Sequence, residues 1–351
     1  MKKNRYIIML LLLLLLIPAQ GVKAQESEGE VNVNELVFGH IGDSYEWHIA
    51  TFGEKTLRIP LPVIVKSSTG WHVFSSSRLE EGSHEGLYIA AEGPYEGKIV
   101  EKNAAGEEVR PFDLSITKNV LGLFINSTLL VVILMSCVRW YKKHPLEQGA
   151  PAGGVGMIEA LVLMIYDDVI KGCIGEDYKR YAPYLLTAFF FVLVNNLMGL
   201  VPFFPGGANV TGNIAITLVL ALFTFAFTNI FGTKAYWKEI FWPNVPVWLK
   251  VPVPMMPLIE FFGILTKPFA LMIRLFANIM AGHAAILSLI AIIFITVKAG
   301  AVINGSMTFV AVAFGIFMDA LEVLVAFIQA YVFTMLSAVF IGLSRVKEEH
   351  E

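Results

Sequence analysis

Two long apolar segments near the C-terminus, residues 257–297 and 307–343, constrain this chain more than any other feature. Each contains about 40 residues and would extend roughly 60 Å as a continuous helix. Since the hydrocarbon core of a bilayer is only about 30 Å thick, neither helix can cross it upright without a sharp break. The lengths predict a hairpin of two strongly tilted membrane helices.

Three shorter apolar stretches predict further membrane helices, at about residues 118–139, 181–203 and 209–233. The first contains 20 successive residues without Asp, Glu, Lys or Arg, which is enough for one crossing. The other two come from one uncharged run of 53 residues, which a proline- and glycine-rich turn at 202–207 divides.

Residues 155–175 combine apolar with acidic and basic positions, a pattern typical of an interfacial helix. Together these elements predict an all-α polytopic membrane domain, residues 116–344, with about five transmembrane helices and a tail at 345–351. Charged residues make up 16% of the chain, hydrophobic residues 56%, and the formal net charge is −3. This composition excludes a soluble enzyme, a disordered chain and a nucleic-acid-binding protein.

The first 24 residues have the pattern of a secretory signal peptide. Three basic residues precede an apolar run from Tyr6 to Ile17, and Val22-Lys23-Ala24 has the small residues of a cleavage site. An uncleaved first membrane helix is the alternative, but this apolar run is shorter than the roughly 20 residues that a crossing needs.

Residues 25–115 alternate apolar and polar stretches between turn residues, which predicts a small β-rich N-terminal domain. The domain is acidic, because residues 25–117 hold 16 Asp and Glu against 7 Lys and Arg. The spacing of its histidines matches no metal-ligand pattern, so we interpret them as surface or hydrogen-bonded side chains. These histidines are His40, His48, His72 and His84.

Basic residues indicate the orientation of the membrane domain. Arg139, Lys142 and Lys143 follow the first predicted membrane helix and mark its cytoplasmic end, which places the N-terminal domain in the periplasm. The tail, with Arg345 and Lys347, then ends in the cytoplasm. We expect a multi-pass membrane protein with an exported N-terminal domain.

Charged and strongly polar residues within the two longest segments predict a functional site. Even low estimates put an Arg or Asp near the bilayer centre at about +2.5 to +3.5 kcal/mol. The first segment contains Glu260, Lys267, Arg274, Asn278 and His283. The second contains Asp319, Glu322 and Gln329.

Arg274 has no acidic residue close to it in the sequence. The nearest, Glu260, is fourteen residues earlier, or about 21 Å along a helix. A permanent pair with Asp319 or Glu322 is one possibility, and a carboxylate on another chain is the other. An always-charged guanidinium suits the second role, because it can attract and release a passing carboxylate without losing its proton.

His283 and Glu322 are titratable groups on adjacent segments and are suited to relay protons. Glu322 and Gln329 are seven residues apart and share a helix face. The alternative is that these polar groups only hold helices together.

Three motifs resemble those of subunit a of the F-type ATP synthase membrane sector. The first contains Thr266-Lys267-Pro268 followed by Arg274-Leu275-Phe276-Ala277-Asn278-Ile279-Met280-Ala281-Gly282-His283. The second runs from Glu322 to Phe333 and includes Gln329-Ala330-Tyr331-Val332. The third is Asn195-Asn196-Leu197-Met198-Gly199-Leu200-Val201-Pro202. The resemblance covers roughly residues 118–344.

The resemblance implies a stator subunit whose two long tilted helices face a ring of c subunits. Arg274 matches the essential arginine that separates two aqueous half-channels and meets the ion-binding carboxylate of the ring. His283 and Glu322 fall at a pair of positions where the acid and the histidine can be exchanged, as a proton relay. Three further residues match polar channel or interface positions, namely Glu260, Asn278 and Gln329.

The implied protein conducts protons across a bacterial inner membrane and couples their flow to rotation and ATP synthesis. It is a component of an enzyme rather than an enzyme by itself. Its implied partners are the c ring, the b subunits of the peripheral stalk, the remaining ATP synthase complex and the lipid bilayer. No cofactor, metal or nucleic acid is expected. The chain departs from the family pattern in its long N-terminal domain and in the extra acid Asp319.

Two other functions fit parts of the same pattern. A secondary transporter could bind substrate and a coupling ion at the buried charges, although no internal repeat is evident. An intramembrane enzyme could use His283, Glu322 and Asp319 as metal ligands, although no His-Glu-x-x-His pattern is present. Activity without partner subunits would favour the first, and bound metal the second.

Overall fold

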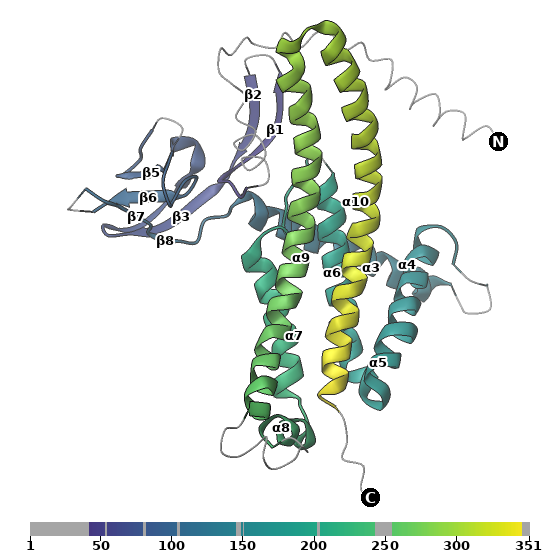
Figure 1. Cartoon of the computed structure of the whole chain (residues 1–351). Helices are drawn as coiled ribbons and strands as arrows, with labels where there is room; N and C mark the ends of the chain where they lie inside the picture. Colours follow the sequence, from purple (N-terminus) through teal and green to yellow (C-terminus); the bar gives the residue numbers. More distant parts are fainter. Residues whose placement is uncertain are drawn as a thin grey trace, which may run out of the picture.

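A helical membrane domain with a β-rich domain at one side makes up the described chain (Figure 1). The structure is a computed structural model and describes residues 42–52, 55–79, 82–103, 106–144, 149, 151–201, 204–242 and 255–345. The predicted signal peptide, residues 1–24, lies outside the described residues. So does all of the predicted tail except Arg345.

The N-terminal domain consists of short antiparallel strands, as the alternating sequence predicts. Its strands are β1 (Glu46–Phe52), β2 (Lys55–Pro60), β3 (Pro62–Ser67), β4 (Gly70–Ser75), β5 (Leu87–Ile89), β6 (Ile99–Lys102), β7 (Glu108–Val109) and β8 (Phe112–Asp113). They form a β1-β2 hairpin and two sheets with the orders β4-β3-β8 and β5-β6-β7. Alternate residues of β3, Val63 and Val65, are fully buried beside Tyr45 and Phe74 in the domain core.

Tyr45 gives this domain a pH-dependent stability. Its hydroxyl donates a hydrogen bond to Asp113 at 2.5 Å, and burial, with this bond and the Asp113 charge, raises the pKa of Tyr45 above its ordinary value of 10.0. The folded domain therefore holds this proton to higher pH than the unfolded chain does. The stabilisation is complete below pH 10.0 and is lost as the pH rises through the raised pKa.

Replacing Tyr45 by phenylalanine should lower the free energy of unfolding of the domain by about 1 kcal/mol at neutral pH, because one buried hydrogen bond is lost. The variant should also lack this part of the alkaline loss of stability. Denaturant unfolding of the purified chain, followed by tryptophan fluorescence at neutral and alkaline pH, measures both effects. The control is Tyr88→Phe, which removes an exposed hydrogen bond to Glu108. Equal losses in the two variants would contradict the prediction.

The membrane domain contains the predicted membrane helices and, between them, three shorter helices. They are α3 (Lys118–Lys143), α4 (Gly154–Leu163), α5 (Gly172–Ile174), α6 (Tyr178–Leu200), α7 (Ile214–Ile230), α8 (Lys234–Phe241), α9 (Met255–Ile295) and α10 (Ala301–Leu343). Among the described residues, four continuous helical stretches are long and apolar enough to cross a membrane. The number is five if α7 and α8, which are bent by 99° relative to each other, count as one. The predicted fold class is confirmed.

Three local features differ from the sequence prediction. The last helix begins at Ala301 rather than at 307, because the turn needs little more than Gly300, whose φ of 100° favours glycine. The stretch predicted as one interfacial helix contains a π-helical segment, Met164–Lys171, between α4 and α5. Helix α8 was not predicted, and it begins where the Thr233 side chain accepts a hydrogen bond from Tyr236 N.

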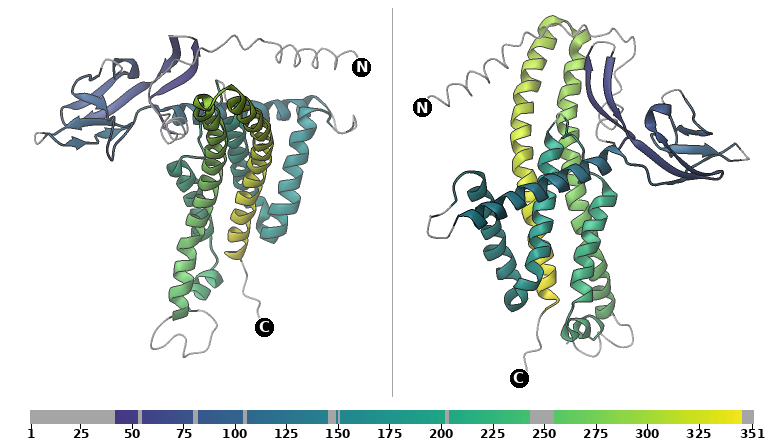
Figure 2. Two further views of the ribbon diagram at one scale, coloured as in Figure 1. Left: turned by 45° about the horizontal axis from the view of Figure 1, so that its top comes forward. Right: turned by 180° about the vertical axis from the view of Figure 1, so that it is seen from behind.

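The two longest helices form an antiparallel hairpin that organises the domain. Helix α10 packs against α9 and α6, and α7 packs against α9 (Figure 1). Large buried side chains fill the space between them, including Leu185, Phe189, Leu271, Leu275 and Phe333. Helix α3 crosses this bundle at a steep angle (Figure 2). If α3 stands near the bilayer normal, α9 and α10 are strongly inclined, as their lengths require.

The C-terminal end of α10 is fixed to the start of α6 and the end of α7. Arg345 donates from Nε to Asp177 Oδ2 at 2.9 Å and from Nη1 to Phe231 O at 2.9 Å. The backbone of Thr233 also donates to Ser344 O at 2.9 Å. These contacts hold one end of the hairpin in place relative to the α6–α7 pair.

Candidate functional site

Most of the predicted site residues lie along the α9–α10 hairpin, which brings together side chains far apart in sequence. A close approach of the two helices occurs at Gly282, where a side-chain carbon would collide with the Glu322 carboxylate. The Glu322 carboxylate thus occupies the space beside α9 that a side chain at position 282 would take.

His283 and Glu322 face each other across this approach. Their Nδ1 and Oε2 atoms are 3.9 Å apart, and the two side chains are 17% and 10% exposed. This distance is too long for a direct hydrogen bond and suits one bridging water. Within the described residues, Glu322 Oε1 is buried without a hydrogen-bond partner. The structure thus brings together an imidazole and a carboxylate, one oxygen atom of which is buried.

A cavity of about 260 Å³ adjoins this pair. It is lined by Leu200, Asn278, Ile279, Ala281, Gly282, His283, Met318, Leu321, Glu322 and Val325. Its volume is enough for several water molecules. Its other walls are mostly apolar, so the polar groups alone determine where a proton can be held.

Asn278 and Gln329 continue the polar contacts from α9 to α10. Asn278 Nδ2 donates to Gln329 Oε1 at 3.3 Å. Gln329 is 4% exposed, and its Nε2 has no partner among the residues that the structure describes. Asn278 is exposed and lies one helical turn after Arg274, on the same face. These amides link the buried cavity to the face that carries Arg274.

Arg274 is exposed on α9, and no ion pair to it occurs in the described part of the chain. The proposed alternative of a permanent pair with Asp319 or Glu322 is therefore not observed there. Large apolar side chains on the same helix, including Phe269 and Ile273, are each 53% exposed. The guanidinium thus lies on an apolar face of the hairpin, where a partner carboxylate could approach it.

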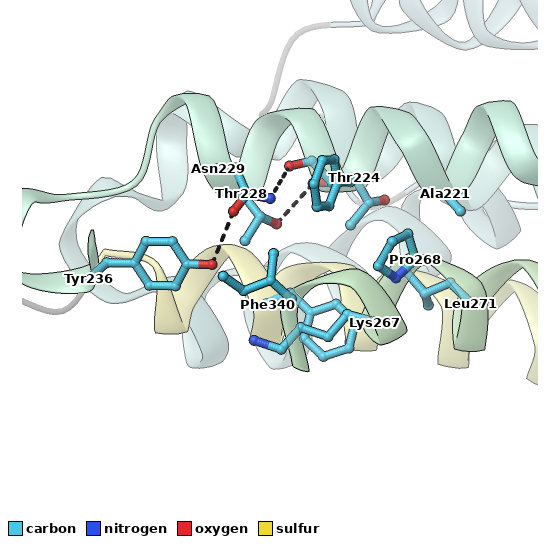
Figure 3. Close-up of a pocket in the computed structure, with 11 residues that line it drawn as sticks. Ala221, Thr224, Thr228, Asn229, Tyr236, Lys267, Pro268, Leu271 and Phe340 are labelled. Atoms are coloured by element: carbon cyan, nitrogen blue, oxygen red, sulfur yellow. Dashed lines mark hydrogen bonds between the residues drawn. The ribbon is translucent and has the colours of Figure 1, made fainter. Parts of the chain in front are cut away.

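A small second pocket of about 10 Å³, with some polar groups among mostly apolar walls, lies on the other side of Arg274 along α9, between α7, α8 and the hairpin (Figure 3). Tyr236 donates its hydroxyl proton to Asn229 Oδ1 at 3.2 Å. Thr228 donates to the Thr224 carbonyl at 2.8 Å. The pocket thus contains hydroxyl and amide groups where the sequence is otherwise apolar.

Lys267 and Glu260 belong to this second region. The Lys267 ammonium lies 5.5 Å from the centre of the Phe340 ring, a cation–π contact that fixes the cation at the pocket. Glu260 is close enough to Tyr236 for an electrostatic interaction. The predicted residues therefore fall into two polar groups, with Arg274 between them.

Sequence reasoning missed several buried amide contacts in the bundle. Asn126 Nδ2 donates to Asn195 Oδ1 at 3.0 Å, and Asn196 Nδ2 donates to Ala326 O at 3.2 Å. All three asparagines are at most 2% exposed. The sequence did contain a signal for these contacts. An asparagine within an apolar run marks an inter-helical contact in a membrane protein.

An intramembrane metalloenzyme would need a cluster of side chains that can bind a metal ion, and the described residues contain no such cluster. Three or more His, Cys, Asp or Glu side chains do not converge anywhere in them. His283 and Glu322 meet, and Asp319, three residues before Glu322 and on the same face of α10, is exposed. The two free cysteines, Cys137 and Cys173, lie on different helices.

Comparison with known proteins identifies the family. Residues 123–342 match the family described as ATP synthase A chain, and residues 36–117 match one described as a domain of unknown function. A protein named ATP synthase subunit a from Chlorobium phaeobacteroides is 47% identical over 244 residues, which cover 68% of each chain. Its counterpart from Chloroherpeton thalassium is 43% identical over 248 residues, 69% of this chain and 70% of the relative.

A more distant relative, also named ATP synthase subunit a, comes from Myxococcus xanthus. It is 42% identical over 244 residues, which cover 68% of this chain and 75% of the relative. The family match includes the whole hairpin with Arg274, His283 and Glu322. By this match, its multi-pass helical fold and its relatives, the chain belongs to the ATP synthase subunit a family, the proton-translocating stator subunit of F-type ATP synthases.

Proposed function

We propose that this chain forms two aqueous half-channels against a c ring, and that proton flow through them drives rotation. The observation that carries the proposal is the position of Arg274 between two polar regions of the hairpin. Lys267 is seven residues before it and His283 nine residues after it, or roughly 10 and 13 Å along the helix. Buried Leu271 and Leu275 separate the two regions inside the bundle.

In this mechanism the His283–Glu322 cavity is the half-channel on the side of the N-terminal domain. A proton reaches Glu322 and His283 through water and passes to a ring carboxylate beside Asn278 and Gln329. Proton transfer between such groups needs hydrogen-bond distances, which one water at the 3.9 Å gap supplies. The other half-channel contains Glu260 and the Tyr236 pocket.

Arg274 keeps the two half-channels apart. Its guanidinium stays protonated at any physiological pH, so it cannot itself relay a proton. It attracts an ionised ring carboxylate with about 4 kcal/mol at 4 Å and an effective dielectric constant of 20. A carboxylate must therefore lose its proton to pass Arg274, which makes net rotation depend on proton flow.

The proposal also includes an orientation and further partners. Basic Lys142 and Lys143 end α3 on the side opposite the N-terminal domain, which supports a periplasmic N-terminal domain and a cytoplasmic C-terminus. The c ring covers the exposed apolar face around Arg274, and the b subunits attach the chain to the rest of the complex. We also propose processing after residue 24, an N-terminal domain at 25–115 and a channel domain at 116–344.

Disulfide cross-linking tests the c-ring contact. Ala277, exposed one turn from Arg274, is replaced by cysteine in a chain whose Cys137 and Cys173 are serine. A second cysteine is placed beside the ion-binding carboxylate of the c subunit. Oxidation of the assembled complex should yield an adduct between the two subunits.

The matched control is Ile279→Cys on the same helix, where the side chain is 7% exposed and faces the bundle. It should give no adduct. Absence of the adduct at Ala277→Cys in a complex that assembles, or equal adducts at both positions, would overturn the proposed interface.

A further inference from the structure

The N-terminal domain contacts the membrane domain through a small interface centred on Trp47. This residue of β1 is 3% exposed, and the buried residues of its cluster, Ala208 and Val210, belong to the segment between α6 and α7. Its ring also packs edge to face on Phe204, with 5.4 Å between the ring centres. The tryptophan is thus buried against a different domain from its own.

The start of β1 is also fixed to the start of α3. Asn119 N donates to Asp43 Oδ1 at 3.0 Å, and Lys118 N donates to Ser44 O at 2.8 Å. Further along α3, a side-chain carbon at Gly122 would lie 3.8 Å from Trp47 and would collide with Ala208. Trp47 therefore occupies a fixed place between α3 and residues 204–213, the α6–α7 segment.

The α6–α7 segment reaches the wall of the His283–Glu322 cavity. Asn209, which is 5% exposed, donates from Nδ2 to Met280 Sδ at 3.7 Å. Met280 lies between two residues of α9 that line the cavity. On α6, a side-chain carbon at Gly199 would be 3.7 Å from both Ala208 O and His283 Nε2. Trp47 is therefore linked to the cavity through a single layer of residues.

We propose that the N-terminal domain positions the external entrance of the His283–Glu322 half-channel, with Trp47 as the positioning residue. The inference rests on the proposed function, and it gives a role to a domain that the common mechanism does not use. The α6–α7 segment has no regular secondary structure, and its buried residues Ala208 and Val210 pack against Trp47. A buried tryptophan supplies a large, rigid contact that selects one arrangement.

Loss of this contact should lower the fraction of time in which protons reach the cavity. Trp47→Ala should therefore raise the external proton concentration needed for half-maximal ATP synthesis by about threefold to tenfold, the range expected for one aromatic contact. The maximal rate at saturating acidity should not change. A role in folding alone would instead lower the maximal rate with the amount of assembled complex.

The charged and titratable groups around the cavity stay the same in this variant. They are His283 on α9, Glu322 and Asp319 on α10, and Lys118 at the start of α3, with Asp43 beside it. A shift in the proton dependence then reports access to the cavity rather than a changed charge.

The measurement uses the whole complex in proteoliposomes with the N-terminal domain inside. Initial rates of ATP synthesis are recorded over a series of lumenal pH values, at fixed outer pH and membrane potential. Trp47→Phe, which keeps an aromatic ring, should restore most of the wild-type dependence. Phe204→Ala, which removes the other ring of the contact, should shift the dependence in the same direction as Trp47→Ala.

The matched control is Trp71→Ala in the same domain, where the side chain is 56% exposed on β4. It should leave the dependence unchanged. An unshifted dependence in both Trp47→Ala and Phe204→Ala, or an equal shift in Trp71→Ala, overturns the inference. If Glu322→Gln abolishes synthesis in the same assay while the Trp47 variants behave as wild type, only this inference fails. If Glu322→Gln has no effect, the proposed function fails.

Discussion

Replacing Arg274 by alanine should abolish ATP-driven acidification of inverted membrane vesicles. The residue is the exposed cation between the two polar regions, without an acidic partner among the described residues. Without the guanidinium, a protonated ring carboxylate can pass between the half-channels, and protons cross without driving rotation. Passive proton conductance of the vesicles should therefore rise while pumping is lost.

A loss of pumping can be assigned to Arg274 only if the variant ATP synthase complex assembles normally. Co-purification of the c ring and of the catalytic head with the variant checks it. Arg274→Lys keeps the charge but not the planar, permanently protonated group, so it should retain little pumping. Unchanged pumping in Arg274→Ala would show that the arginine has no part in transport, and the proposed mechanism would be wrong.

Replacing Glu322 by glutamine should lower proton pumping about a hundredfold, the lower end of the range for loss of a proton-transfer group. Glutamine has nearly the same shape, so the approach at Gly282 and the cavity are retained, but it cannot exchange a proton. The same vesicle assay, with the amount of assembled complex determined in parallel, measures the loss.

A variant in which His283 and Glu322 exchange places provides the sharpest comparison with the single replacements. His283→Glu combined with Glu322→His keeps one acid and one imidazole across the 3.9 Å gap, so it should pump better than either single replacement. Asp319→Ala should have a smaller effect, because this acid is exposed one turn earlier on α10 and would only hydrate the channel wall. A double exchange no better than the single variants would contradict a relay between the two positions.

The site residues could be predicted because a charge in an apolar run is costly and therefore visible in a sequence. Arg274, His283, Glu322 and Gln329 were found in this way, and the family resemblance assigned their roles. The pairing of His283 with Glu322 needed the close approach at Gly282, which depends on how two helices pack. Spacing along one helix says nothing about that distance.

Other features were not visible in the sequence. Helix α8 follows directly after the bend at Thr233 and is only eight residues long, so it has too few residues for a clear hydrophobic pattern. Trp47 was an ordinary strand residue in an alternating pattern, since its burial against Ala208 and Val210 comes from another domain. Long-range contacts of this kind leave no periodicity in either partner.

The sequence by itself determined the membrane-spanning segments, the β-rich N-terminal domain, the buried charges and the family, because hydropathy and charge act locally along the chain. Only the tertiary structure decided which polar groups meet, how Arg274 is left exposed between two polar regions, and where the N-terminal domain attaches. These depend on helix packing, where small residues such as Gly282 and Gly122 set how closely distant segments approach.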